Sequence, residues 1–251
     1  MTAIDAMLYR EAKIRATNLI FIFWDVFYPL GYMLVFGVGV NSALGSPLLP
    51  EHVDYNALFL ASVLGMASFG IASNTSWSFF LDRDNGIFFE MLTYPLSRSA
   101  YMLGKVLFTL VVSLVQAIIT VALASLMFHI RLAWGRIPLA FLVMVAGTAG
   151  WFFFYAIFAL STRRNDIFNT LTSILYFVLL FASNMFYPLE PLPTWLRRVA
   201  LANPITWQID CLRWGTIGLG RTDRVLLEAA GFCLFALASF WYAARCLERQ
   251  E

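Results

Sequence analysis

Six long apolar stretches run along the chain and leave few folds open to it. A helix rises about 1.5 Å per residue, so crossing a hydrocarbon core of about 30 Å takes about 20 apolar residues. Because lipid offers no partner to exposed backbone groups, and no barrel-type alternation is visible, each stretch is predicted to be a helix. The stretches cover residues 19–40, 57–81, 103–128, 137–160, 167–186 and 225–244. The predicted fold class is therefore an all-α polytopic membrane protein with six transmembrane helices.

The composition of the 251 residues excludes a soluble domain. Hydrophobic residues make up 61% of the chain and charged residues 13%, against about 45–50% and about 25% in soluble proteins. A soluble core of this size has too little polar surface to cover so many apolar side chains. The net charge of +2 is too small to indicate nucleic-acid binding, so no nucleic-acid partner is expected.

An even number of spans places both termini on the same side of the membrane. The segments 1–18, 82–105, 161–166 and 245–251 then share a compartment and carry ten Lys and Arg residues. The opposite side carries seven, five of them in the long segment 187–224. Short cytoplasmic loops are enriched in Lys and Arg, whereas long loops are weak topology signals. Both termini are therefore predicted to be cytoplasmic.

Residues 1–18 mix apolar side chains with Arg10, Lys13 and Arg15. This pattern predicts a short amphipathic helix on the cytoplasmic membrane surface, with a frayed basic terminus as the alternative. No internal repeat or low-complexity segment is visible, so residues 1–251 are predicted to form a single transmembrane domain.

Small residues form a stripe along each of two predicted spans. The stripes are Ala61, Gly65, Ser68, Ala72 and Thr75 in the second span, and Ser113, Ala117, Thr120 and Ala124 in the third. Such stripes let helix backbones approach closely in lipid. Packing within the chain and a dimer contact explain them equally well. The first span is rich in aromatic residues instead, which could face lipid, a partner subunit or an amphiphilic substrate.

Few residues inside the predicted spans could carry chemistry. Asp25 is the one clear charge, about one turn inside the cytoplasmic end of the first span, and Pro29 is expected to kink the same helix. The sequence has no HExxH helix, Gly-x-Ser-x-Gly elbow, Ser-x-x-Lys pattern or Walker A loop. We therefore expect no catalytic residue, no metal and no cofactor on this chain, and no ATP bound through a P-loop of its own.

The predicted cytoplasmic connection 82–102 is longer than a reversal of direction needs. It begins with a charged, turn-forming run and continues as a short amphipathic helix, which Pro95 ends before Ser97 caps the next helix. Phe88 and Phe89 beside Glu90 are typical of an anchor for a groove on another protein. A helix lying flat at the lipid interface is the alternative.

The predicted external segment 187–224 is too apolar for a free loop and too broken by prolines for a span. Two short helices that dip into the outer leaflet, separated at Asn203 and Pro204, fit it best. Asp210 and Arg213 lie three residues apart on the second helix, so they could pair.

At these two segments the sequence resembles the ABC-2 type exporter permeases, the membrane subunits of bacterial ATP-binding-cassette exporters. The cytoplasmic residues that match are Asp82, Arg83, Asp84, Gly86, Glu90, Leu92, Pro95, Ser97, Arg98, Leu103, Gly104 and Lys105. The external residues that match are Asn203, Pro204, Thr206, Asp210 and Arg213. Within the family, the drug-resistance and Nod-factor-export branch is the most similar.

The resemblance implies a homodimer of this chain joined to two copies of a separate ABC ATPase subunit, which binds ATP and Mg. Such a complex exports a hydrophobic or amphiphilic substrate, a drug, a lipid or a lipid-linked glycan, across the cytoplasmic (inner) membrane.

The resemblance also implies roles for residues. The cytoplasmic loop would form a coupling helix that sits in a groove of the ATPase. The residues assigned to this contact are Arg83, Asp84, Gly86, Phe88, Phe89, Glu90, Leu92, Pro95 and Arg98. The first, second and fifth spans would line the dimer seam. The candidate substrate contacts there are Asp25, Phe27, Tyr28, Phe69 and Asn74. The competing interpretation is a non-enzymatic membrane scaffold or biogenesis factor that recruits a soluble partner through the same loop.

Overall fold

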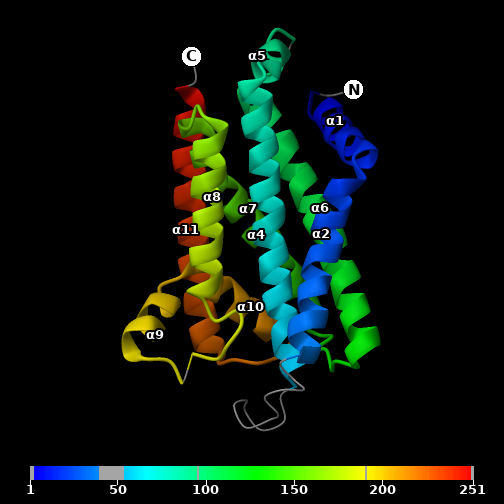
Figure 1. Ribbon diagram of the computed structural model, residues 1–251, viewed down its shortest axis with the longest axis vertical. Coiled ribbons are helices and arrows are strands. Elements are labelled where there is room, and N and C mark those ends of the chain that lie inside the picture. The colour runs from blue at the N-terminus through cyan, green and yellow to red at the C-terminus, as the bar shows by residue number, and fades with distance from the viewer. Residues whose placement is uncertain (1–2, 40–53, 95, 190, 250–251) are drawn as a thin grey trace.

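A computed structural model describes residues 3–39, 54–94, 96–189 and 191–249 of the chain (Figure 1). Every regular element within those residues is a helix, which confirms the all-α fold class. The elements are α1 (Ala3–Thr17), α2 (Leu19–Tyr32), the π-helical η1 (Met33–Val38), α4 (Tyr55–Asp84), α5 (Ile87–Met91), α6 (Arg98–Phe128), α7 (Ile137–Ser161), α8 (Asn165–Phe181), α9 (Thr194–Leu201), α10 (Pro204–Ile217) and α11 (Thr222–Glu248).

Four helices, α4, α6, α7 and α11, are long and apolar enough to cross a membrane. The other two predicted spans correspond to shorter apolar helices, one covering Phe27–Gly37 and the other α8. The first of these changes from α- to π-helix at Met33, one turn past Pro29, which cannot donate a backbone hydrogen bond. The second ends at Phe181, so residues 182–186 form turns instead of the helix predicted there.

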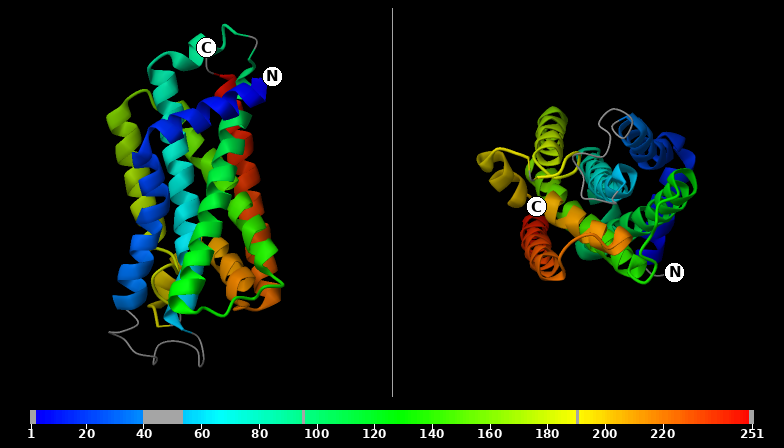
Figure 2. Two further views of the ribbon diagram at one scale, coloured as in Figure 1. Left: turned by 90° about the vertical axis from the view of Figure 1, so that its right-hand side faces the viewer. Right: turned by 90° about the horizontal axis from the view of Figure 1, so that it is seen from below.

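The helices form one bundle with α1, α5 and the end of α11 at one end, here called the α5 end (Figures 1 and 2). Helices α9 and α10 lie at the opposite end, the α10 end, on either side of Asn203. Helix α1 crosses the bundle instead of running along it, and packs mainly against α6 (Figure 2). The connection at the α5 end is shorter than residues 82–102, because α4 continues to Asp84 and α6 already begins at Arg98.

Helix α4 is the centre of the bundle and contacts α2, α6, α7 and α10. Its whole small-residue stripe is buried, and a Cβ atom on Gly65 would lie 3.0 Å from Cγ1 of Ile209 in α10. The small residues of α6 are buried as well, and Ala117 and Ala124 share a cluster with Phe59 of α4. Both stripes therefore pack within the chain, which answers the question that the sequence left open.

A network of buried polar side chains connects α10 with α4 and α7 in the interior of the bundle. Gln208 of α10 accepts a hydrogen bond from Nε1 of Trp151 (2.7 Å) and donates one to Oγ of Ser68 (3.0 Å), which also accepts one from Thr148 (3.1 Å). All four side chains are buried. Gly147 makes room for the network, because a Cβ atom there would overlap the side-chain amide of Gln208.

We expect Gly147→Ala to destabilise the protein by about 1–3 kcal/mol, the usual cost of overpacking a core. The added methyl group has to displace Gln208 and break its two hydrogen bonds. Thermal unfolding of the detergent-solubilised protein measures the effect. Gly31→Ala is the matched control, because nothing lies within 4 Å of a Cβ atom there. Equal melting temperatures for the two variants would contradict this account of the network.

Candidate functional site

The segment between α4 and α6 is built on a left-handed glycine and a buried ring. Gly86 has a φ of 75°, a conformation that side chains rarely adopt, and it allows α5 to start directly after the turn that ends α4. Phe88 then packs against Tyr101 and Phe79, with ring centroids 5.1 and 5.9 Å apart. As expected, Ser97 caps α6, since its Oγ accepts a hydrogen bond from the backbone N–H of Ala100 (3.1 Å).

Three of the residues assigned to contact with another protein make contacts within this chain instead. Phe88 is completely buried, so it holds α5 to α4 and α6 and is not available as an anchor for a partner. Arg83 donates to the backbone oxygens of Leu160 (2.6 Å) and Thr162 at the end of α7. Arg98 donates to the backbone oxygen of Glu248 (3.3 Å). Sequence patterns could not show these contacts, because each joins segments that are far apart in the chain or in different helices.

The aromatic and acidic side chains that the loop exposes are Asp84, Phe89, Glu90 and Tyr94, here called the α5 surface; Asn85 and Thr93 are exposed beside them. Phe89 is 44% exposed and Tyr94 66% exposed, and both acids are exposed. Leu92 is half-buried, and Pro95 lies outside the described residues. The α5 surface thus combines two exposed aromatic rings, a residue type enriched at protein contacts, with two carboxylates.

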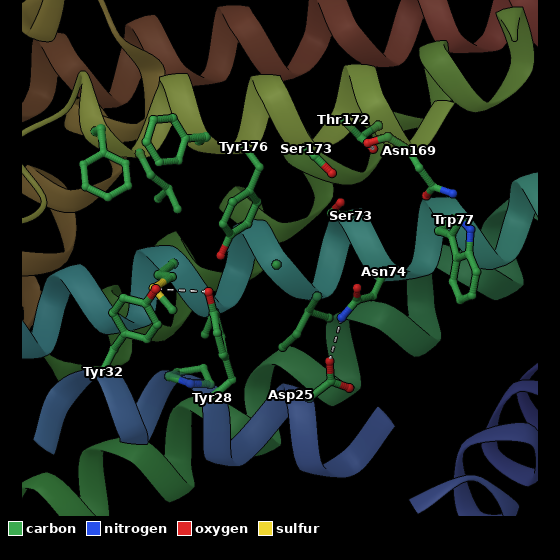
Figure 3. A pocket seen from close by; sticks show the side chains of 18 of the residues that line it. Asp25, Tyr28, Tyr32, Ser73, Asn74, Trp77, Asn169, Thr172, Ser173 and Tyr176 are labelled. Carbon is green, nitrogen blue, oxygen red and sulfur yellow. Dashed lines mark hydrogen bonds between the residues drawn. The ribbon is translucent and has the colours of Figure 1, made fainter. Parts of the chain in front are cut away.

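A cavity of about 640 Å³ lies between α2, α4 and α8 (Figure 3). Its wall is partly aromatic and includes Phe177, Phe181 and Phe186. Its polar lining is made by Asp25, Tyr28 and Tyr32 of α2, by Ser73, Asn74 and Trp77 of α4, and by Asn169, Thr172, Ser173 and Tyr176 of α8. The volume lies in the range of cavities that hold small-molecule ligands.

Among the described lining residues there is one carboxylate, and an arginine outside the cavity balances its charge. Asp25 is 4% exposed, and its Oδ2 lies 2.7 Å from Nη2 of Arg15 in α1. Its Oδ1 accepts a hydrogen bond from Nδ2 of Asn74 (3.4 Å), as Figure 3 shows. Within the described residues, the buried indole N–H of Trp77 has no hydrogen-bond partner. The cavity therefore offers rings and uncharged polar groups and little net charge, and the Trp77 N–H is enclosed in its wall.

The structure places the candidate substrate contacts in two groups. Asp25, Tyr28 and Asn74 line the cavity. Phe27 is 59% exposed and stacks on Phe23, and Phe69 is completely buried behind the wall, stacked on Tyr176. The polar face of α8 was missed by the sequence analysis, although Asn169, Thr172, Ser173 and Tyr176 recur at the three- to four-residue spacing of one helix face.

The motif at the α10 end ties α10 to the turn that follows α8. Asn203 caps α10 by accepting from the backbone N–H of Ile205 (3.0 Å), and donates to the backbone oxygens of Leu179 (2.7 Å) and Ala182 (3.0 Å). Pro204 is the first residue of α10, where a missing N–H costs nothing. The hydroxyl of Thr206 accepts from the backbone N–H of Asn184 (3.3 Å).

Asp210 and Arg213 complete this connection and, as predicted, form an ion pair (3.2 Å). Asp210 also accepts from the side chain of Asn184 (2.6 Å), and Arg213 donates to the backbone oxygen of Asn184 (2.7 Å) and to Ser62 of α4 (3.3 Å). The residues of the motif thus hold the end of the cavity-lining helix α8 against α10 and α4.

The structure is a helical bundle with apolar helices, a ligand-sized cavity and a protruding surface at one end, an arrangement that a membrane permease can use. Within the described residues, no group of three His, Cys, Asp or Glu side chains is placed to hold a metal ion. Residues 2–217 match the family described as ABC-2 type transporter, and the chain belongs to that family. It is thus a membrane subunit of an ABC transporter. The permease subunits of this family are not catalytic and work with a separate ATPase subunit.

Several named permeases are similar to this chain. It is 24% identical to the putative transport permease ycf38 of Porphyra purpurea over 221 residues, which cover 80% of this chain and 76% of the relative. It is 26% identical over 212 residues to the daunorubicin resistance ABC transporter permease protein DrrB1 of Streptomyces coeruleorubidus, with 82% and 73% covered. It is also 26% identical over 156 residues to the probable multidrug ABC transporter permease YbhR of Escherichia coli K12, with 61% and 42% covered.

Asn203→Ala is expected to destabilise the protein by about 1–3 kcal/mol, through loss of the helix cap and of hydrogen bonds to buried backbone oxygens. The melting temperature in detergent tests this expectation. Asn18→Ala is the control, because Asn18 precedes α2 in the same position but makes no capping hydrogen bond. An Asn203→Ala protein as stable as the control would show that the motif does not fasten α10.

Proposed function

We propose that the chain is the transmembrane subunit of an ATP-driven exporter that moves a hydrophobic or amphiphilic substrate out across the cytoplasmic (inner) membrane. The cavity between α2, α4 and α8 carries this proposal. It is large enough for a small molecule, and no catalytic constellation is found among its lining residues. Membership of the ABC-2 type transporter family supports an ATPase as the source of energy.

The lining of the cavity favours an amphiphile as the substrate. Aromatic rings from α2 and α8 bind the apolar part of a molecule, and uncharged amides and hydroxyls bind its polar part. Because Arg15 compensates Asp25, the cavity has no strong preference for a fixed charge. Aromatic drugs, lipids and lipid-linked glycans all meet these conditions. Similarity to a daunorubicin resistance permease supports drugs as candidates for this chain.

The active unit in this proposal is a homodimer bound to two copies of the ATPase. Two of the helices that line the cavity expose apolar side chains, Phe23 and Phe27 on α2 and Ile174 and Phe177 on α8. A second copy packed against these faces would close the cavity over and exclude lipid from it. Six spans, made by α2 with η1, α4, α6, α7, α8 and α11, complete the proposed topology.

The proposed orientation places the α5 end, with both termini, in the cytoplasm. The distribution of Lys and Arg supports this orientation. The α5 surface then faces the ATPase, and Asp84, Phe89, Glu90 and Tyr94 contact it. Arg83, Phe88 and Arg98 support that surface from within the bundle.

Glu90→Arg is expected to weaken ATPase binding and to abolish ATP-driven transport while the membrane fold stays intact. A reversed charge in a desolvated contact costs about 2–5 kcal/mol. The tests are the amount of ATPase that co-purifies and the rate of ATP hydrolysis in reconstituted vesicles. Asp166→Arg is the control, because it makes the same change in an exposed ion pair away from α5. A Glu90→Arg complex that keeps its ATPase and pumps normally would refute the assignment of the α5 surface.

Ser173→Ala removes an exposed hydroxyl that lines the cavity. We expect it to raise the concentration of a hydrogen-bonding probe such as daunorubicin that half-maximally stimulates ATP hydrolysis by about 2–10-fold, the value of one hydrogen bond. Ser125→Ala, the same change outside the cavity on α6, should change nothing. If both variants respond as the unmodified complex does, Ser173 does not contact the probe. If no probe stimulates ATP hydrolysis at all, a scaffold explains the chain better than an exporter.

A further inference from the structure

A second cavity, of about 470 Å³, lies at the α5 end between α6 and α11, and is here called the α6–α11 groove. Both helices pack on α7, which contributes Phe153 to the wall of the groove. The groove shares no lining residue with the cavity between α2, α4 and α8. It is therefore a separate site that the proposed function does not use.

Most of the α6–α11 groove is apolar. Met102 and Val106 of α6 and Leu247 of α11 lie in its wall and are buried. The rings of Phe153 and Phe240 also line it, and pack edge to face with their centroids 4.9 Å apart. A surface of this composition favours the binding of a hydrocarbon chain.

The polar residues of the groove lie together at its outer end. Arg98 and Ser99 begin α6, and Glu248 is the last residue of α11. Val106 follows Arg98 by eight residues and Phe240 precedes Glu248 by eight, so the apolar lining extends about 12 Å along both helices from the polar end. The groove thus matches a membrane lipid, which has a polar head group and long apolar chains.

Exposed apolar side chains border the groove on both helices. Leu103 and Leu107 of α6 are 46% and 40% exposed, and Trp241 of α11 is 54% exposed. The second copy is proposed to cover α2 and α8, so the faces of α6 and α11 are left to lipid. Arg245 lies over the ring of Trp241 (3.6 Å to the centroid), and tryptophan is typical of the depth where a membrane meets water. The polar end of the groove therefore lies at the level of the lipid head groups.

Arg98 and Glu248 bring opposite charges to this end of the groove. Arg98 donates one hydrogen bond to the backbone oxygen of Glu248 (3.3 Å), and a guanidinium has five N–H donors in all. The carboxylate of Glu248 is exposed, and within the described residues no ion pair joins it to Arg98. A ligand can therefore contact a positive and a negative side chain side by side.

We propose that the α6–α11 groove binds a phospholipid with an ethanolamine head group. The acyl chain lies between α6 and α11, Arg98 and Ser99 bind the phosphate, and Glu248 binds the primary ammonium. A guanidinium matches the geometry of a phosphate, and basic pockets between membrane helices are known to bind lipid head groups. The proposal requires only that the chain spans a membrane, and it is independent of the ATPase and of the exported substrate.

The carboxylate of Glu248 makes the proposed site selective among lipids. The ammonium of ethanolamine can donate hydrogen bonds to it, whereas the quaternary ammonium of choline has no N–H group. A glycerol head group carries no positive charge to balance Glu248. Phosphatidylethanolamine should therefore bind more tightly than phosphatidylcholine or phosphatidylglycerol with the same acyl chains.

Native mass spectrometry of the full chain in detergent, titrated with each of these three lipids, tests the proposal. For the first lipid bound per chain, we expect phosphatidylethanolamine to bind about 3–10-fold more tightly than either of the others, the value of one hydrogen bond. Glu248→Gln should reduce this preference to less than about twofold while phosphatidylcholine binds as before, because the ammonium loses its charged acceptor. Asp223→Asn is the matched control, because it removes an exposed carboxylate at the other end of α11 and should leave the preference unchanged.

A second pair of variants tests the place of the acyl chain. Ala244→Phe puts a ring into the groove and should abolish the binding of the first lipid of all three kinds. Ala238→Phe, the same change at an exposed position of α11 outside the groove, should have no effect.

Each result either supports or overturns the proposal. Equal binding of the three lipids by the unmodified chain overturns it, as does a preference for phosphatidylethanolamine that survives Glu248→Gln. Binding to Ala244→Phe that equals binding to Ala238→Phe shows that the lipid lies elsewhere. Loss of the preference in Glu248→Gln, together with loss of binding in Ala244→Phe alone of the two phenylalanine variants, supports the proposed lipid site.

Discussion

The bilayer core holds no water, so each polar group that the chain carries into the membrane has to find its partner within the protein. Helix α4 meets much of this demand, with polar contacts along its whole length. From one end to the other these are Ser62 with Arg213, Ser68 with Thr148 and Gln208, Asn74 with Asp25, and Asp82 with Arg10 and Lys105. Because these contacts reach α1, α2, α6, α7 and α10, α4 is the axis about which the other helices are placed.

The neighbours of α4 are not held equally firmly. Helices α7, α10 and α11 pack extensively against α4 or one another, and α7 and α10 also share the network of Gln208 with it. Helix α8, by contrast, buries only Phe168, Thr172 and Leu180, and has limited contact with α4 and α7. The cavity thus has the firmly packed α4 and the lightly packed α8 in its wall. A movement of α8 would change the shape of the cavity without disturbing a close-packed core, which is what the proposed transport requires.

The sequence was informative where structure depends on local pattern. Long apolar runs predicted the helices of the bundle, and Ser97, Asn203 and the pair of Asp210 with Arg213 had their expected local roles. It was misleading where a residue's role depends on a distant segment. Phe88 and Arg83 are residue types that often occur in docking surfaces. Their partners, however, lie on α6 and at the end of α7, and no local pattern identifies these partners.

The cavity was predicted only in part for the same reason. Asp25 was a visible candidate because a charge in an apolar helix is unusual. The α8 face that opposes it consists of ordinary polar residues, and only the packing of α2, α4 and α8 shows that they surround a common space. The compensation of Asp25 by Arg15 depends on how α1 crosses the bundle, so the charge of the cavity could not be inferred from the span alone.

Ion pairs hold α1 to α4, α6 and α2. Buried ion pairs are often no more stabilising than apolar side chains of similar size, so stability alone does not explain their presence. Their distinguishing property is that they fix one arrangement. An apolar interface tolerates small shifts, whereas Arg10 loses Asp82, Glu11 loses Lys105 and Arg15 loses Asp25 when α1 moves relative to α4, α6 or α2. A helix held in this way moves together with its partners or breaks its contacts.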